Sequence, residues 1–245
     1  PIAVDYPNTI KNPFLGTPKM PWEQIDLPLY RAHNWHCLDG SPRTPYASIY
    51  TSLGCPYSCY YCNIQTLYGK PQITYRPLTD IYNDLLYLKD EGVRNLKIWD
   101  EMFALEEDRV VDICNLMGKD NFNAWAYARL DRITPLMLQS MKYAGINWVA
   151  YGFESTRDKK FVNPDKVIKM TRDAGINIMA NIMFGLGNDQ KDLDWAMEQS
   201  FEFVNFYTAI PYPGSRWYKE TNPTQEWGTY NQYGQWWYNM TSAAV

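Results

Sequence analysis

Three of the five cysteines in this 245-residue chain fall within eight residues, and their spacing points to metal chemistry. Cys55, Cys59 and Cys62 follow the pattern C-x3-C-x2-C. Three thiolates from one tight loop can each bind one iron of a cubane iron-sulfur cluster, whereas four are needed to close the shell with protein ligands alone. The motif therefore predicts a cluster with one open iron, which is what binding and reductive cleavage of a sulfonium requires.

A structural zinc site is the alternative use of the same three cysteines, with His36 or Cys37 as a fourth ligand. Zinc sites usually consist of two separated ligand pairs, and the sequence has no second C-x2-C or H-x3-H pair. The cluster is therefore the favoured prediction. The cysteines also do not form the dense framework of a small secreted protein, so a reducing cytoplasm is expected.

The composition excludes several classes of protein. With 46% apolar and 16% aromatic residues, the chain can bury a sizeable core. A net charge of -4 gives no electrostatic reason to expect a nucleic-acid partner. No apolar window is long enough to span a bilayer, and no secretion signal is recognisable. The chain begins with Pro1 rather than Met, which indicates a trimmed, processed or partial chain.

From Ala47 onward, strand and helix patterns alternate. Strands are expected at 47–52, 95–99, 124–128, 148–151, 178–184 and 203–209, and helices at 79–90, 106–117, 134–145, 163–175 and 193–201. Such alternation predicts a parallel sheet with helical crossovers. A complete barrel needs two more such units. The predicted fold class is thus α/β, a partial (β/α)6 TIM-like barrel.

Three segments are predicted along the chain. Residues 1–46 are rich in proline and form an extended linker or wrapping segment, in which a hydrogen-bonded role for His33 and His36 is favoured over a ligand role. Residues 47–215 form the barrel. Residues 216–245 are an irregular, aromatic-rich C-terminal extension that covers the barrel edge, lines a substrate pocket or packs on the remainder of a longer chain.

The ends of the predicted strands carry the remaining candidate residues. In barrels of this kind the chemistry gathers at the carboxyl ends of the strands. The cysteine loop follows the first strand, and polar or glycine-bearing segments follow the next four. Their candidate residues are Asp100 and Glu101, then Arg129, then Glu154 and Ser155, then Gly185.

These motifs together resemble a known family. The cysteine motif, Trp99-Asp100-Glu101-Met102-Phe103, Tyr151-Gly152-Phe153-Glu154-Ser155 and Pro211-Tyr212-Pro213-Gly214-Ser215 are similar to segments of the radical S-adenosylmethionine (SAM) superfamily. Within it, they resemble the branch whose members often carry an N-terminal cobalamin-binding domain. The resemblance implies a 4Fe-4S cluster on the three cysteines, with SAM chelating the fourth iron. Reductive cleavage of SAM would give a 5′-deoxyadenosyl radical that takes hydrogen from an unknown substrate, followed by methyl transfer or oxidative cyclisation.

The resemblance also assigns roles to single positions. Tyr61 matches the residue that contacts the adenine, and Asp100 and Glu101 match an acidic motif that contacts the SAM amine. The remaining matches are Glu154 and Ser155, a polar pair that reaches SAM, Arg129, which could fork onto its carboxylate, and Gly185, on the adenine side. Two departures stand out: no Gly-Gly pair accompanies the acidic motif, and Gly185-Leu186-Gly187 replaces the more usual Gly-x-Pro-Gly.

The expected partners are a one-electron donor of the flavodoxin or ferredoxin type and a small-molecule substrate. Cobalamin is expected only if a missing domain or a partner supplies it, because about 45 residues before the barrel cannot form a Rossmann unit. Two other functional classes remain open. One is a zinc-stabilised binding module, and the other is an inactive barrel that serves a partner.

Overall fold

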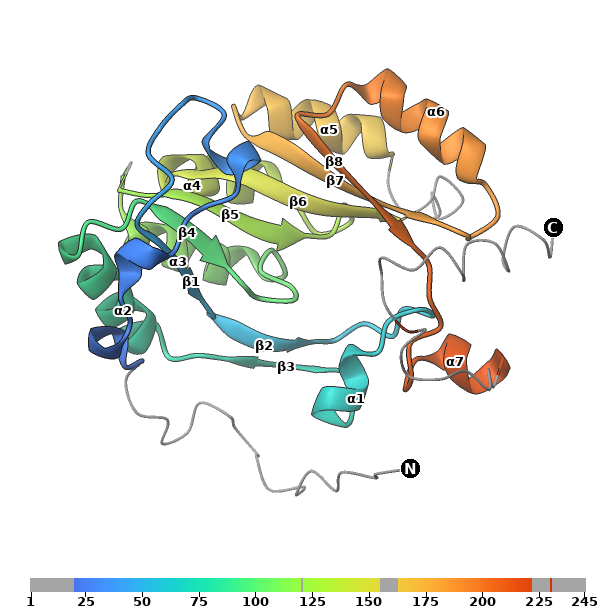
Figure 1. Ribbon diagram of the computed structural model, residues 1–245, viewed down its shortest axis with the longest axis horizontal. Coiled ribbons are helices and arrows are strands. Elements are labelled where there is room, and N and C mark those ends of the chain that lie inside the picture. Colours follow the sequence, from blue (N-terminus) through green and yellow to red (C-terminus); the bar gives the residue numbers. More distant parts are fainter. Residues whose placement is uncertain (1–19, 120, 155–162, 222–229, 231–245) are drawn as a thin grey trace.

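The computed structural model describes residues 20–119, 121–154, 163–221 and 230. Six strands form one parallel sheet in the order β1-β4-β5-β6-β7-β8. They are β1 (Tyr46–Ile49), β4 (Asn95–Ile98), β5 (Asn123–Ala128), β6 (Ile146–Glu154), β7 (Asn177–Phe184) and β8 (Phe203–Thr208). The sheet runs as an open arc with β1 and β8 at its edges (Figure 1). The predicted α/β partial barrel is confirmed.

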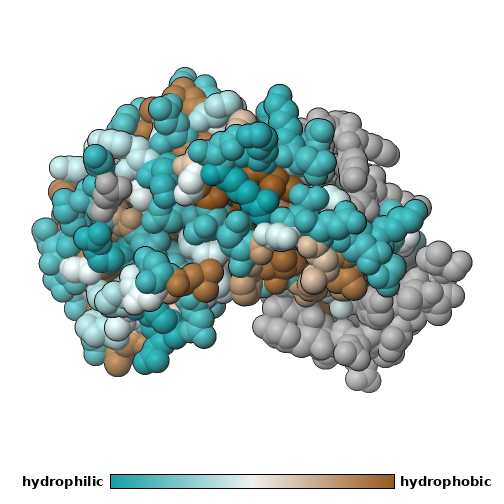
Figure 2. Space-filling view, turned by 90° about the horizontal axis from the view of Figure 1, so that it is seen from above, coloured by the Kyte–Doolittle hydropathy of each residue, from teal (hydrophilic) through white to brown (hydrophobic). Residues whose placement is uncertain are grey.

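Five helices connect successive strands of this sheet and lie outside the arc (Figure 1). They are α2 (Leu78–Asp90), α3 (Glu107–Met117), α4 (Pro135–Tyr143), α5 (Pro164–Asp173) and α6 (Asp189–Gln199). Thr134 and Asn163 cap α4 and α5 as predicted, each accepting a hydrogen bond from a first-turn backbone N–H. Figure 2 shows that the face carrying α5 and α6 is mostly hydrophilic. Within the described chain, every helix is too short or too polar to cross a bilayer.

The two faces of the sheet have different compositions, because successive residues of a strand point to opposite sides. The outer face, under the helices, packs aliphatic residues such as Leu96, Ile98 and Ile178 into the main core. The inner face carries a second cluster of Trp125, Trp148, Ala150 and Met179, with Trp35, Tyr127 and Phe203 packed against it.

The sequence did not reveal a small two-stranded sheet beside the cysteines. The first strand was predicted to run to Ser52, but β1 ends at Ile49 and the chain enters β2 (Ser52–Cys55), which pairs antiparallel with β3 (Gln72–Tyr75). Between them lies α1 (Ile64–Tyr68). The cysteine loop is therefore braced by its own hairpin-like pair rather than hanging from a strand of the main sheet.

Two helix predictions need correction. Helix α6 begins at Asp189 rather than Leu193, because acidic residues favour the first turn of a helix. The predicted irregular segment 216–245 begins with a helix, α7 (Arg216–Thr221). There Trp217 stacks on Tyr60 at a centroid distance of 5.9 Å, a tertiary contact that short-range periodicity does not reveal.

The described part of the N-terminal segment follows the sheet as three short 3₁₀ helices: η1 (Trp22–Gln24), η2 (Leu27–Leu29) and η3 (Asn34–Cys37). Trp22 and Leu27 are buried in the outer core. Trp35 instead packs against the inner face, with ring centroids 5.3 Å from Trp125 and 5.1 Å from Trp148. The segment thereby covers the amino-terminal ends of the inner face.

Candidate active site

Asp100, directly after β4 and Trp99, fixes the chain where it leaves β1 for the cysteine loop. Its carboxylate accepts hydrogen bonds from the Thr51 backbone N–H (2.6 Å), the Thr51 hydroxyl and the Ser52 hydroxyl (2.7 Å). Asp100 is only 1% exposed. Burial raises the pKa of its carboxyl, and the hydrogen bonds from Thr51 and Ser52 act in the opposite direction. Both carboxylate oxygens of Asp100 therefore accept hydrogen bonds from donors of the protein itself.

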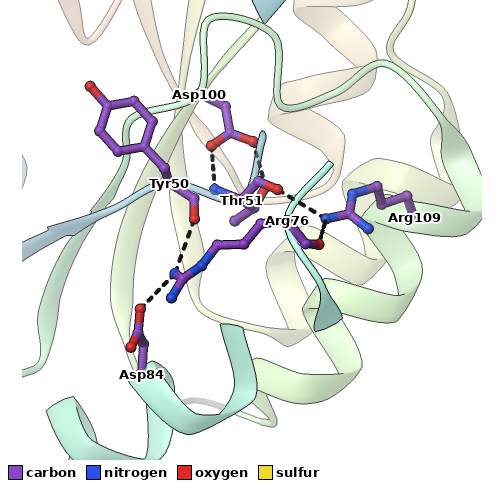
Figure 3. A network of polar contacts seen from close by, with 6 residues as sticks. All are labelled: Tyr50, Thr51, Arg76, Asp84, Asp100 and Arg109. Carbon is purple, nitrogen blue, oxygen red and sulfur yellow. Dashed lines mark hydrogen bonds and ion pairs between the residues drawn. The ribbon is translucent and has the colours of Figure 1, made fainter. Parts of the chain in front are cut away.

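Two arginines complete this network on the other side of Thr51 (Figure 3). Arg109 donates from Nη2 to the carbonyls of Thr51 (2.9 Å) and Arg76 (2.8 Å). Arg76 in turn forms a buried ion pair with Asp84 at 2.6 Å. Asp100, Arg109 and Arg76 each bind a backbone group of Tyr50 or Thr51, directly after β1, so the entry to the cysteine loop is held from both sides.

Glu101, the next residue, reaches the cysteine loop itself. Its Oε2 accepts from the Gly54 backbone N–H at 3.0 Å, and its Oε1 accepts from the Tyr68 hydroxyl at 3.3 Å. Gly54 has φ of +89°, and a Cβ there would lie 2.5 Å from the Gln72 carbonyl oxygen. Only glycine fits this position of β2, where the backbone passes close to β3 one residue before Cys55.

The three cysteines are unpaired thiols of intermediate exposure on this loop. Cys55 ends β2, and a turn closed by the Cys62 N–H and the Cys59 carbonyl (3.1 Å) brings the other two together. Burial raises the pKa of Cys55 and of Cys62, and the neighbouring thiols raise both further. The three cysteines therefore lie close enough for Cys59 to raise the pKa of both Cys55 and Cys62.

Arg129, just past the end of β5, is a cation in direct contact with these thiols. Its Nη1 lies 3.7 Å from the Cys59 Sγ, and its guanidinium lies 4.0 Å from the centroid of the Tyr57 ring. Nε and Nη2 are both taken by Asp131 at 2.9 Å. The bidentate edge predicted for a SAM carboxylate is therefore engaged by Asp131, and Nη1 faces the cysteine loop.

Glu154 closes the site from the end of β6. Its backbone has φ of +55°, unusual for a non-glycine residue. Its carboxylate folds back over Gly152, with Oε1 only 2.5 Å from where a Cβ of that residue would lie. The negative charges of Glu154 and Glu101 both contribute to the raised pKa of Cys62, after burial and Cys59. Two carboxylates and one guanidinium therefore surround the thiols.

Tyr61, Gly185 and Ser155 are the remaining residues that the sequence predicts for the site. Tyr61 lies in the loop between Cys59 and Cys62 and is partly buried. Gly185 directly follows β7, and its backbone N–H donates to the Asp189 side chain at 2.8 Å. Ser155 lies outside the described residues.

The structure places the proposed fourth zinc ligands away from the cysteines. Asn123, which begins β5, donates from Nδ2 to the His36 carbonyl at 3.1 Å, and Cys37 lies 3.3 Å from Asn95, which begins β4. The cysteine loop lies near the opposite ends of these strands, so neither His36 nor Cys37 can share a metal with it.

The described part of the chain contains no group of three or more His, Cys, Asp or Glu side chains gathered closely enough for a single metal ion. Tetrahedral zinc, with Zn–S bonds of about 2.3 Å, needs such tight gathering. A cubane cluster binds each cysteine through a different iron and so accepts more widely spaced thiols. Three thiols on one short loop, close enough for their charges to interact, match the three-cysteine ligand set of such a cluster.

Sequence reasoning missed several residues that shape this region. Tyr57 stacks on Arg129, and Trp217 stacks on Tyr60, so α7 packs on the cysteine loop. Lys97, in the middle of β4, is 4% exposed. The alternation of side chains along a strand could have indicated Lys97, because it places this residue on the face opposite Leu96 and Ile98.

Comparison with known proteins adds an independent line of evidence. The family described as the Radical SAM superfamily matches residues 49–199. The bacteriochlorophyllide d C-8(2)-methyltransferase of Chlorobaculum tepidum is 25% identical over 223 residues, which are 79% of this chain and 49% of that protein. An uncharacterised methyltransferase of Pyrococcus horikoshii is 23% identical over 189 residues, 70% of this chain and 41% of that protein.

A solved structure shows the same fold. The radical SAM methyltransferase TsrM of Kitasatospora setae, with cobalamin and a 4Fe-4S cluster bound, has a TM-score of 0.63 at 17% identity, over 80% of this chain and 44% of that one. The chain thus spans less than half the length of these relatives. The family match covers more than half of the chain and includes all three cysteines with the residues that surround them. On this evidence the chain belongs to the radical SAM superfamily, a family of enzymes that use a 4Fe-4S cluster and SAM.

Proposed function

We propose that this chain is the catalytic barrel of a radical SAM enzyme, in which Cys55, Cys59 and Cys62 bind three irons of a 4Fe-4S cluster. The observation that carries the proposal is the set of three unpaired thiols on one braced loop at the carboxyl end of the parallel sheet. When bound, the cluster would pass one electron to the sulfonium of SAM and so yield the 5′-deoxyadenosyl radical that abstracts hydrogen from substrate.

The surrounding charges match the charges of SAM. Glu101 and Glu154 offer carboxylates to its amine and sulfonium, and both lie near Cys62. Arg129 offsets the charge of the thiolates through Nη1, which is also the guanidinium nitrogen left for the SAM carboxylate. Tyr61 packs on the adenine. By family position, Ser155 joins Glu154 as the polar pair that reaches SAM, and Gly185 lies on the adenine side.

Asp100 takes a different part in this proposal. Its two oxygens already accept three hydrogen bonds from Thr51 and Ser52. We therefore assign it to positioning the cysteine loop, and assign the contact with the SAM amine to Glu101.

The substrate is a small molecule, and the reaction after hydrogen abstraction is methyl transfer or an oxidative cyclisation. The names of the matched relatives favour methyl transfer. If cobalamin takes part, a further domain or a partner supplies it. The electron donor is of the flavodoxin or ferredoxin type, and a reducing cytoplasm suits the oxygen-sensitive site.

Three units organise the chain in this proposal. Residues 1–46 wrap the sheet, residues 47–215 form the catalytic barrel, and residues 216–245 form an extension that begins by packing on the cysteine loop. Within the described residues, the contacts of Trp35 with the inner face and of Trp217 with Tyr60 support the two flanking assignments.

The test is anaerobic reconstitution with iron and sulfide, followed by reduction with dithionite in the presence of SAM and chromatography for 5′-deoxyadenosine. The wild-type chain is expected to form 5′-deoxyadenosine, and Cys59→Ala is expected to form none. Cys114→Ala is the matched control, since Cys114 is a fully buried thiol in α3, away from the loop. A cluster that assembles without cleaving SAM would identify an inactive barrel, and stoichiometric zinc without a cluster would identify a binding module.

A further inference from the structure

Lys97 is a buried lysine that the proposed SAM chemistry leaves without a role. It lies in the middle of β4, and its neighbours Leu96 and Ile98 belong to the outer core. Strand alternation therefore turns Lys97 to the inner face, where its residue exposure is 4%. Lysine is almost never buried to this extent unless it is paired.

Aromatic rings surround the amine. The Lys97 Nζ lies 2.8 Å from the centroid of the Trp99 ring, 4.3 Å from that of Trp125 and 5.4 Å from that of Tyr127. Trp35 packs edge-on against Trp125 from the amino-terminal side. Ring faces attract a cation but leave its charge uncompensated. The result is a positively charged group set in apolar walls.

No acidic side chain among the described residues forms an ion pair with Lys97. Burial alone lowers its pKa, to about 7. The titratable group that Lys97 itself influences is His33, whose pKa the lysine charge lowers further after burial. Among the described residues, the amine is therefore surrounded by aromatic rings and by His33, whose protonation the lysine charge disfavours. These residues provide no negative charge to balance a buried ammonium.

The position of Lys97 connects it to the active site. Trp99 follows it by two residues on the same face and is 45% exposed. Asp100 and Glu101 come next and hold the cysteine loop. Two residues of strand correspond to about 7 Å, so Lys97 lies one layer of side chains below the rim that carries the proposed SAM site.

The inner face offers further polar groups at its far side. Asn181 on β7 accepts from the Asn205 side chain on β8 at 3.1 Å, and donates to the Tyr151 carbonyl at 3.1 Å. Because these amides are neutral, Lys97 is the cationic group among them that favours a negatively charged ligand. Aromatic walls with a few fixed polar groups are typical of small-molecule sites.

We propose that Lys97 binds the anionic group, a carboxylate or a phosphate, of a substrate whose flat apolar body packs against Trp99 and Tyr127. The inference rests on the proposed function, because it places this substrate directly beneath the SAM site. The substrate supplies the counter-charge that the described residues do not provide, and the aromatic walls exclude water from the pair, which strengthens it.

The test is equilibrium dialysis of three probes against the anaerobically reconstituted 245-residue chain, with and without SAM. The probes are 2-naphthoate, 2-naphthyl phosphate and the uncharged 2-naphthamide. The chain is compared with Lys97→Met, which keeps the length of the side chain, and with Lys191→Met, which removes an exposed lysine on α6. The visible absorbance of the cluster checks that each variant is folded.

At least one anionic probe is expected to bind the wild-type chain about tenfold or more tightly than the amide, a free-energy difference of about 1.4 kcal/mol. Lys97→Met should abolish this preference and Lys191→Met should retain it, in the presence of SAM as well. Equal affinity for all three probes, an anion preference that survives in Lys97→Met, or loss of probe binding on addition of SAM would overturn the proposal. None of these readings depends on 5′-deoxyadenosine formation, so failure here is distinct from failure of the radical SAM assignment.

Discussion

The two faces of the same six-stranded sheet differ sharply in what they contact. On the outer face, Leu96, Ile98 and Ile178 are fully buried among aliphatic side chains beneath the helices. On the inner face, at the alternating positions of the strands, Lys97, Trp125 and Asn181 present a cation, a ring and an amide. The outer face is what any α/β sheet needs in order to stay folded, whereas the inner face carries groups that are costly to bury unless they serve a ligand.

A single strand, β4, contributes to both faces and to the cysteine loop. In β4, residues 96 and 98 maintain the core, residue 97 faces the inner side, and residues 100 and 101, just beyond its end, hold the cysteine loop. The side-chain period of two separates these tasks within six residues. Substitutions on the two faces should therefore have separable effects, and the following predictions are ordered by the size of the effect expected.

The largest effect on stability is expected on the outer face. Ile98→Ala should destabilise the chain by about 2–5 kcal/mol, because Ile98 is fully buried and leaves a cavity. Trp99→Ala, at a half-exposed inner position, should cost much less stability but weaken probe binding. Urea unfolding measures the first quantity and dialysis the second. Equal losses of stability in the two variants would show that the two faces do not have separate roles.

A second prediction concerns the closure of the inner face by η3. Within the described chain, neither ring nitrogen of His36 has a hydrogen-bond partner, and burial lowers its pKa from 6.5 to about 4. Below pH 6.5 the unfolded chain therefore binds a proton that the folded His36 excludes, so stability falls as the pH drops toward 4. The loss amounts to about 3 kcal/mol in total.

His36→Phe should remove this acid sensitivity, as measured by urea unfolding at pH 7.5 and pH 5. His33→Gln, an exposed neighbour, serves as the control. An unchanged pH dependence in His36→Phe would mean that the imidazole is protonated in the folded chain.

A third prediction concerns the rim where the two faces meet. Asp100→Asn replaces one of the two carboxylate acceptors by a donor, although three donors converge on this group. The mismatch should cost about 1–3 kcal/mol and lower the iron content after reconstitution. The exposed Asp112→Asn on α3 is the matched control. Full iron content in Asp100→Asn would show that the loop does not depend on this anchor.

The smallest expected effect is a pH dependence on the inner face. An anion binds the protonated amine of Lys97, whose pKa is lowered to about 7. Affinity for 2-naphthoate should be constant well below pH 7 and fall about tenfold per pH unit above it, as the amine loses its proton. Lys97→Met should show a flat profile in the same dialysis measurement. A flat profile in the wild type would remove Lys97 from the binding site.

The sequence predicted much of this architecture because the relevant signals are local. Six strands and five connecting helices were recognisable from periodicity and from caps such as Thr134 and Asn163. The cysteine motif was recognisable from spacing alone. These features depend on neighbours within a few residues.

The remaining features depend on contacts between distant residues. The strand that ends at Cys55 is held in place because Gly54 lies close to the Gln72 carbonyl and donates to Glu101. Helix α7 packs on the cysteine loop through the stacking of Trp217 on Tyr60. Likewise, only the three-dimensional structure shows that Arg129 donates to Asp131 and that Asp100 accepts from Thr51. A strand-end charge indicates a site, but only its partners show whether it is available to a ligand.

The most direct test of the central claim is electron paramagnetic resonance of the dithionite-reduced, reconstituted chain, recorded before and after addition of SAM. Three-cysteine ligation leaves one iron open, so we expect a reduced 4Fe-4S signal whose g values change when SAM is added. A 4Fe-4S signal that SAM leaves unchanged, or the absence of any such signal, would contradict the assignment of Cys55, Cys59 and Cys62 as the ligands of a SAM-binding cluster.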